Sequence, residues 1–426
     1  MSKEERLRWL ARLYGSDPET VDDSEADEHL ADRLNDFGMA NFLTTYRPLA
    51  KLRDTHGRLE FELREIDHAE ATLTYAELFR DGQPEFVLRV RFDDGPDHRI
   101  RYWSSFPPLP PEVHIRPYRP TDAADCAALD LACAMEMDDG SSWLVDRGAA
   151  FDDYLTMMGR YDAQVVVADE QIVGFYSNAL RPIRLKDEFC HAAYQHHYRV
   201  HPDYRAGSVS MALASEVDSR HTFRDEAVVM PYSLIDPHNV HMGNMGFPAV
   251  PDLTVARLTL PVSGTSGSVI EQAELSEAIR LSDLTHGQRT MYPQGDRAYW
   301  EERLSRIPSY GHEQLVRNEH AMLGVWSIGE RNVLRTTEGS SERRLAFALD
   351  YGFEDVDALV RLIEAYAGAL AARGITHLSF LLDTRAEEYA ALAARADDEQ
   401  QFYLHTLPWL LEAVGAGVFY PDGVYC

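Results

Sequence analysis

Two stretches of the chain, residues 112–262 and 269–426, follow the same order of predicted elements, and this repetition constrains the fold more than any other feature of the sequence. Each stretch contains a hairpin of apolar strands, then a strand that leads directly into a helix, then further apolar strands. The helix is clearest over residues 355–374, where apolar side chains gather on one face. We therefore expect an α+β protein with two mixed-sheet domains in tandem.

The remaining part, residues 1–111, is predicted to be a small α+β domain. Apolar side chains at helical spacing in residues 19–52 precede strand-like runs whose turns are supplied by Asp-Gly pairs. The prolines within residues 107–111 cannot continue a sheet and form a stiff linker, while SGTSGS at 263–268 forms a flexible one. Helices packed on a curved antiparallel sheet, with PDHRI at 96–100 as the start of a strand, resemble the cone-shaped domain of the nuclear-transport-factor-like superfamily.

The charge balance limits the possible partners. The 426 residues include 41 Lys and Arg against 70 Asp and Glu, a formal net charge of −29. A field of this sign repels a DNA duplex and an anionic membrane surface, so we expect neither as a partner. No apolar run approaches the roughly 20 residues of a membrane helix, and the charged start lacks a signal core. With four cysteines and no CxxC pair, the sequence predicts a cytoplasmic protein.

Residues 194–213 combine a strand, a tight turn and the start of a helix. The strand ends at Val200, and Pro202 prevents its ladder from continuing. Small residues then lead directly into the helix. Such a turn directs several N–H groups into one concavity, which is an arrangement that binds phosphate. Arg205, at the start of the turn, would add a charge-assisted contact.

This string resembles the signature of the GNAT superfamily of acyl-CoA-dependent N-acyltransferases. Val200-His-Pro-Asp-Tyr-Arg205 matches the end of the family's fourth strand, and the residues after it match the pyrophosphate loop loosely, with serines at both expected glycine positions. The resemblance spans residues 113–260 and implies acetyl-CoA or another acyl-CoA as co-substrate. The residues that it assigns to CoA binding are Arg199, Val200, Arg205, Ala206, Gly207, Ser208, Val209, Ser210 and Asn239.

Side chains alternate between the two faces of a strand. One face of this strand is expected to carry Tyr194, His196, Tyr198 and Val200, and the other Gln195, His197 and Arg199. In the GNAT family the bases on this strand share the face of the valine, which implies His196 as general base. Tyr194 and Tyr198 would line the acceptor cleft. The family also splays its fourth and fifth strands, which implies free N–H groups near Arg199 and Val200 that polarise the thioester carbonyl.

Two other chemistries compete for the same segment. A metal site could use the histidines, but adjacent histidines of a regular strand point to opposite faces, so no metal is expected. Cys190 could be a nucleophile, but no partnering base is identifiable. The histidines concerned are His191, His196, His197 and His201.

The second repeat is expected to be a degenerate copy. After its strand at 343–353 it lacks both an arginine and a run of small residues, and Asp350 and Glu354 would repel a phosphate. This copy is therefore predicted to complete the acceptor pocket instead of binding CoA. Some tandem GNAT proteins place the terminal carboxylate in the active cleft, which suggests Cys426 as a base or as an anchor for the acceptor.

The leading hypothesis is an acyl-CoA-dependent N-acyltransferase, with acetyl as the expected group, that transfers it directly from the thioester to a small amine. One alternative is a GNAT-fold enzyme with another donor, either a carrier-protein thioester or an aminoacyl-tRNA. The other is a non-catalytic binding protein. The sequence leaves a homo-oligomer open.

Overall fold

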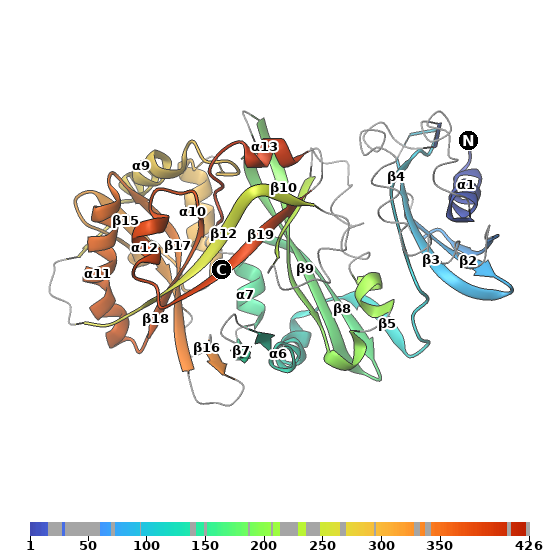
Figure 1. Cartoon of the computed structure of the whole chain (residues 1–426), viewed down its shortest axis with the longest axis horizontal. Helices are drawn as coiled ribbons and strands as arrows, with labels where there is room; N and C mark the ends of the chain where they lie inside the picture. The colour runs from blue at the N-terminus through green and yellow to red at the C-terminus, as the bar shows by residue number, and fades with distance from the viewer. Residues whose placement is uncertain are drawn as a thin grey trace.

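The computed structural model describes the chain apart from residues 16–27, 30–59, 70–72, 94, 137–141, 149–150, 186–187, 206–207, 214–228, 236–247, 265–269, 294, 328–332, 337–341, 407–409 and 423–426. Within the described part, one small sheet and one large sheet organise the molecule (Figure 1).

An N-terminal unit packs one helix against a four-stranded antiparallel sheet. The helix is α1 (Lys3–Gly15), and the strands in sheet order are β1 (Glu62–Asp67), β2 (Leu73–Arg80), β3 (Gln83–Phe92) and β4 (Ile100–Phe106). Helix α1 was not predicted, although Leu7, Leu10 and Tyr14 have helical spacing and are buried against the sheet. The helix expected within residues 19–52 lies almost entirely outside the described residues, and the cone-like resemblance stays a prediction.

The first repeat forms half of a continuous 15-stranded sheet. Its strands in sheet order are β5 (Val113–Pro117), β8 (Arg160–Ala168), β9 (Gln171–Leu185), β10 (Glu188–Val200) and β11 (Val229–Ile235). Neighbouring strands are antiparallel except β10 and β11, which are parallel. Helices α6 (Ala123–Ala132) and α7 (Phe151–Met157) cover one face, and the helical residues 208–213 cover the other.

The second repeat forms the other half. Its strands in sheet order are β13 (Glu271–Gln272), β14 (Leu315–Arg317), β15 (Ala321–Trp326), β17 (Glu342–Phe353) and β18 (His377–Asp383), the last two parallel. Its helices are α9 (Leu275–His286), α10 (Arg297–Arg306), α11 (Val356–Ala372), α12 (Tyr389–Ala393) and α13 (Leu411–Gly415). Gly352 of β17 allows α9 to lie close, because a Cβ there would stand 2.4 Å from the main-chain carbon of Leu281.

The two halves exchange their last strands. β12 (Ala249–Pro261) follows β11 in the chain but pairs with β18 and β19, while β19 (Asp398–Thr406) pairs with β11 and β12. Figure 1 shows these two strands side by side at the centre of the molecule. A second link joins β7 (Ser142–Asp146) of the first half to β16 (Val333–Thr336) of the second. The α+β class and the tandem arrangement are confirmed, but the halves share one sheet and were predicted as separate domains.

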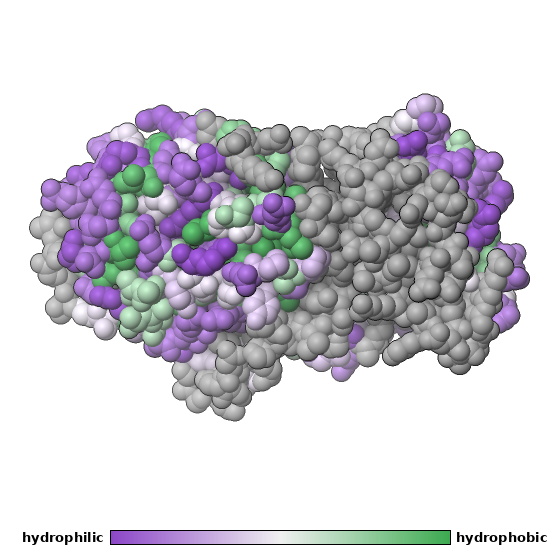
Figure 2. Space-filling model, turned by 45° about the horizontal axis from the view of Figure 1, so that its top comes forward, coloured by the Kyte–Doolittle hydropathy of each residue, from purple (hydrophilic) through white to green (hydrophobic). Residues whose placement is uncertain are grey.

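The remaining short elements are β6 (Met135–Glu136) and the 3-10 turns η2 (Pro120–Asp122), η4 (Pro202–Tyr204) and η6 (His312–Gln314). None of the helices in the described part of the chain is long and apolar enough to cross a membrane. On the face shown in Figure 2, hydrophilic side chains dominate the described surface, and hydrophobic ones gather toward the middle of the molecule.

Candidate active site at a fork in the sheet

The sheet opens between β10 and β11. Their parallel ladder runs from His191 paired with Val229 to Gln195 paired with Ser233, and from there to Val200 none of the described residues pairs with β10 on that side. We call the point where the ladder ends the fork. Unpaired main chain in the middle of a sheet is costly unless something else binds it. The opening is therefore a candidate site for an extended ligand lying along β10.

A β-bulge sits just beyond the fork. His196 pairs with Ser177 of β9 and Arg199 pairs with Phe175, so two residues of β10 stand opposite one residue of β9. His197, inside the bulge, has φ of 53°, which is a left-handed conformation that is rare for a non-glycine residue.

The bulge overturns the predicted assignment of faces. Tyr194 and His196 do share a face, with their rings stacked at 5.2 Å. Beyond the bulge, however, Tyr198 and Val200 pack with the helical residues 208–213 on the opposite face, while Arg199 reaches α6. An extra residue shifts the alternation by one position, which moves every later side chain to the other face. Tyr198 therefore packs in a core and is separated from Tyr194 by the sheet.

The same bulge brings the two adjacent histidines together. Nδ1 of His196 lies 2.7 Å from Nδ1 of His197, and Oγ of Ser177 lies 3.2 Å from Nε2 of His196. The argument that these histidines point to opposite faces is therefore wrong, because the strand is irregular at this point. Even so, the described residues contain no group of three His, Cys, Asp or Glu side chains able to hold a metal ion.

Both imidazoles are buried, and their surroundings favour the neutral form of each ring. Burial, reinforced by the nearby Arg147, lowers the pKa of His196 to about 3. Burial, Arg147 and His196 hold the pKa of His197 well below its ordinary value. The sequence argument expected His196 to titrate near its unperturbed pKa of roughly 6.5. The structure corrects that expectation, because a fully buried imidazole beside a guanidinium cannot easily become charged.

A buried carboxylate ties this strand to the first helix. Asp130 of α6 forms an ion pair with Arg147, and its other oxygen lies 3.2 Å from Nε of Arg199. The Arg147 guanidinium also lies 4.4 Å from the ring centre of Tyr154, whose ring contacts His197 at 4.8 Å. The bulged segment is thus held by α6 and α7 on one face, which fixes the shape of the opening.

Main-chain groups at the end of β10 face the opening. His201 N–H donates to the carbonyl of Val173 in β9, so by the alternation of an antiparallel ladder the N–H of Val200 points away from β9. The carbonyl of Val200 accepts from Nε of Arg205 at 3.0 Å and from Sγ of Cys133 at 3.5 Å. Of the N–H groups predicted near Arg199 and Val200, that of Val200 lies on the open edge, whereas that of Arg199 belongs to the β9 side.

The predicted phosphate turn is described only in part. Arg205 is exposed at its start, Val209 is buried, and Ser208 and Ser210 are partly buried within the helical residues 208–213. Ala206, Gly207, Asn239 and Cys426 lie outside the described residues. Their assigned roles, like that of His196 as general base, stay predictions.

The C-terminal tail reaches the face of the sheet that carries Tyr194. Asp422 is buried and lies 2.8 Å from Nη2 of Arg303 in α10 and 3.5 Å from Nη1 of Arg181 in β9. The ring of Phe419 lies 6.3 Å from that of Tyr232, the residue beside Tyr194 in the ladder. The second half thus packs its tail against the first half, on the side of the fork where an acceptor pocket was predicted.

The second half has a fork of its own, and side chains bridge it. The ladder of β17 and β18 ends at Phe347 and Ser379. Beyond that point, Tyr351 of β17 donates to Glu388, which follows β18, and Arg289 forms a buried ion pair with the same carboxylate at 2.8 Å. These contacts connect β17 with the segment after β18 beyond the end of their ladder.

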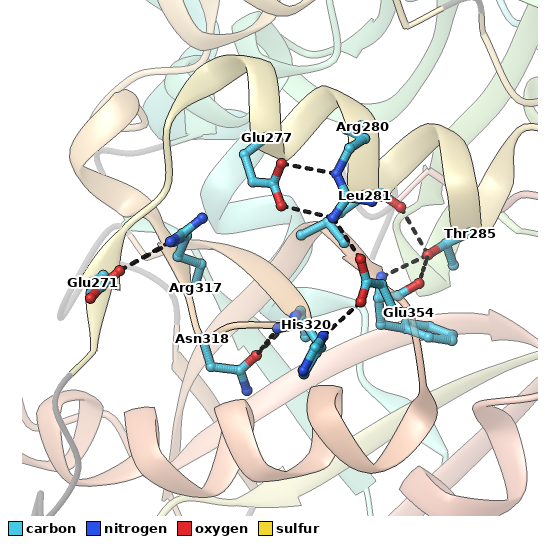
Figure 3. Close-up of polar contacts among 11 residues, drawn as sticks. Glu271, Glu277, Arg280, Leu281, Thr285, Arg317, Asn318, His320 and Glu354 are labelled. Carbon is cyan, nitrogen blue, oxygen red and sulfur yellow. Dashed lines mark hydrogen bonds and ion pairs between the residues drawn. The ribbon is translucent and has the colours of Figure 1, made fainter.

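The turn after β17 is likewise occupied by acidic side chains. Glu354 lies 2.8 Å from Nη2 of Arg280 and 2.6 Å from Nδ1 of His320. Figure 3 shows its carboxylate between these two side chains. Asp355 caps α11 by accepting from the N–H of Ala358 at 2.7 Å, which places a carboxylate where a phosphate would bind. Asp350 was expected to repel a phosphate at this turn. The structure instead places its carboxylate in a buried ion pair with Arg303, where it does not face the turn.

Three residues around the fork were not predicted: Ser177, Arg147 and Asp130. A signal existed for Asp130, because Cys126, Asp130 and Cys133 have the spacing of one helix face, and a carboxylate on a buried face requires a cationic partner. Arg147 and Ser177 come from other elements, and only the fold brings them to His196.

Comparison with known proteins agrees with this geometry. No family model matches the chain, and no curated protein matches it in sequence. A crystal structure of Saccharomyces cerevisiae N-myristoyltransferase with bound myristoyl-CoA is similar in fold, with a TM-score of 0.54 and 12% identity over 80% of this chain and 90% of that chain. A second structure of the yeast enzyme with myristoyl-CoA gives a TM-score of 0.53 and 11% identity over 74% of this chain and 80% of that chain. With its forked parallel strands in each half, the chain has the tandem GNAT fold.

Proposed function

We propose that the protein is an acyl-CoA-dependent N-acyltransferase that transfers a small acyl group, such as acetyl, to a small amine. The observation that carries the proposal is the opening of β10 from β11 after Gln195 and Ser233, in a chain whose fold is that of N-acyltransferases. The extended arm of the donor would lie along β10 beyond the fork. The N–H of Val200 would bind that arm.

In the proposed reaction, the amine nitrogen attacks the thioester carbonyl near His196, the C–S bond breaks, and CoA leaves as the thiol. The attacking amine is neutral and loses one proton as the amide forms, and the CoA sulfur gains one proton, directly from the nitrogen or by way of solvent. His196 stays neutral at ordinary pH, so its Nε2 can accept a hydrogen bond from the amine in place of the Ser177 hydroxyl and orient the amine. Direct attack needs no covalent intermediate on the protein. The second half, with its bridged fork, would shape the acceptor side and bind no second CoA.

Calorimetric titration with CoA tests the donor. If CoA binds with micromolar affinity, a CoA concentration one hundred times Kd should raise the free energy of unfolding by about 2.7 kcal/mol. Replacing Arg205 with alanine should weaken binding about tenfold, because a charge-assisted contact is lost. The matched control is Arg361→Ala, an exposed arginine on α11 in the second half, which should leave binding unchanged. A folded protein that binds no CoA would point instead to another donor or to a binding role.

A screen of amines with labelled acetyl-CoA tests the acceptor. His196→Asn should then lower kcat while leaving the affinity for CoA nearly unchanged, because the imidazole faces the reacting amine and not the nucleotide. Unchanged kcat would remove His196 from the mechanism.

A further inference from the structure

A row of polar side chains crosses the sheet at the level of the fork. Four strands contribute residues that stand directly opposite one another in the ladders, on the face away from His196. In sheet order the row is Asn178, Gln195, Ser233 and His405. All four are at most 9% exposed.

Such a row is unusual for the interior of a sheet. A central strand buried on both faces normally carries apolar side chains, because a polar group taken out of water costs free energy unless it is hydrogen-bonded. Here Oγ of Ser233 donates to Oε1 of Gln195 at 2.9 Å, which joins the last paired residues of β10 and β11. On this face, the closed end of the fork therefore carries a hydrogen-bonded pair of polar side chains, Gln195 and Ser233, which we call the floor of the fork.

The other face of the fork is also polar. His196, the first residue beyond the ladder, lies within 3.2 Å of the Ser177 hydroxyl, and both side chains are buried. A group that enters the opening and reaches its closed end thus meets Gln195 and Ser233 on one side and the Ser177–His196 pair on the other. A long hydrocarbon chain would have to remove these polar groups from their hydrogen bonds, or bury itself against them without any gain.

We infer that the fork selects short or hydrogen-bonding acyl groups and excludes long alkyl chains, with Gln195 and Ser233 as specificity-determining residues. This inference rests on the proposed function, because it takes the donor's acyl group to lie at the closed end of the opening. The inferred preference for short acyl groups would distinguish this chain from the yeast N-myristoyltransferase, which has a similar fold and whose structure holds myristoyl-CoA.

The test is a chain-length series on the intact protein, in which CoA, acetyl-CoA, hexanoyl-CoA and myristoyl-CoA are titrated by calorimetry below their micelle concentrations. CoA and acetyl-CoA should bind within a few-fold of each other, and myristoyl-CoA should bind no tighter than acetyl-CoA. Tighter binding of myristoyl-CoA by tenfold or more would overturn the inference while leaving the proposed function intact. Failure of CoA itself to bind would overturn the proposed function and the inference with it.

A pair of variants tests the residues. The double variant Gln195→Leu with Ser233→Ala makes the floor apolar and should shift the ratio of hexanoyl-CoA to acetyl-CoA affinity at least tenfold toward hexanoyl-CoA. The matched control is Gln164→Leu, a buried glutamine on the same face but two strands away in β8, which should leave that ratio unchanged. An unchanged ratio in a folded double variant, or an equal shift in the control, would reject the assignment. If the double variant does not fold, the series on the native protein decides.

Discussion

One residue, His197, sets the geometry of the candidate site. Its left-handed backbone creates the bulge that turns its ring toward His196 and sends Tyr198 and Val200 to the other face. A non-glycine residue in this conformation is strained, and such strain persists only where the surroundings hold it in place. The rings of Tyr154, Phe151 and Phe175 pack around this imidazole and provide that support.

Two substitutions at His197 separate the backbone from the side chain. His197→Ala and His197→Gly both remove the imidazole, but only glycine adopts positive φ without a steric cost. The glycine variant should therefore be more stable than the alanine variant by about 1 kcal/mol, measured by denaturant unfolding. Equal stability of the two would show that the bulge relaxes once the ring is gone.

The burial of His196 predicts a pH dependence of stability. The unfolded chain binds a proton at this site below a pH of roughly 6.5, whereas the folded protein does so only near 3, so stability is lost as the pH falls through that window. The His196→Asn substitution removes this linkage. When the pH falls from 7 to 5, the free energy of unfolding of this variant should therefore decrease by about 2 kcal/mol less than that of the native protein. Urea unfolding at the two pH values measures it. The exposed His191 of the same strand, replaced by Asn, is the matched control.

At the level of elements, the exchange of β12 and β19 decides how the two halves depend on each other. Without β19, the edge of β11 has no partner at Tyr232 to Ile235, and without β12 the edge of β18 is likewise exposed. An unpaired strand in the middle of a sheet exposes main-chain groups and apolar side chains together. The two halves should therefore fold as one cooperative unit, which includes the second fork.

Expression of the halves tests this dependence. A fragment of residues 112–264 and a fragment of residues 265–426 should each be insoluble or unfolded alone, and should form a stable complex when they are produced together. Circular dichroism and size-exclusion chromatography distinguish these results. A folded, monomeric 112–264 fragment would contradict the role given to β19.

At the level of the whole molecule, a buried charge network fixes the C-terminal tail. Arg303 lies between Asp350 at 3.1 Å and Asp422 at 2.8 Å, and Tyr310 donates to Asp350 at 2.6 Å. Arg181 adds a contact from the first half. Each of these buried charges needs its partner of opposite sign, because the desolvation free energy of a buried ion is otherwise not compensated.

Removing one charge should release the tail. Asp422→Asn leaves Arg303 and Arg181 short of a carboxylate and should lower the free energy of unfolding by about 3–5 kcal/mol. It should also speed hydrogen exchange in residues 416–422. The matched control is Asp203→Asn, which changes a carboxylate that is 83% exposed and should have little effect. Slow exchange of the tail in the Asp422 variant would show that packing of Phe419 and Tyr420 is sufficient.

Local patterns predicted most of the elements, including β10, its stop at Pro202, and the Asp169–Glu170 turn, where both residues have positive φ. They failed at His197, because a bulge inserts one residue and leaves no mark in a sequence of alternating side chains. They also failed at α1, whose apolar spacing was present in the sequence but was considered only as a possible signal segment.

The sequence by itself determined which segments are strands and helices, that the order repeats, and that a strand ending at Val200 leads into a helix, because periodicity and the lack of a proline N–H act over a few residues. Only the tertiary structure decided which strands pair across the middle of the sheet, and that Ser177, His196, Gln195 and Ser233 surround one fork. Pairing between residues far apart in the chain depends on the packing of whole faces, which no local pattern contains.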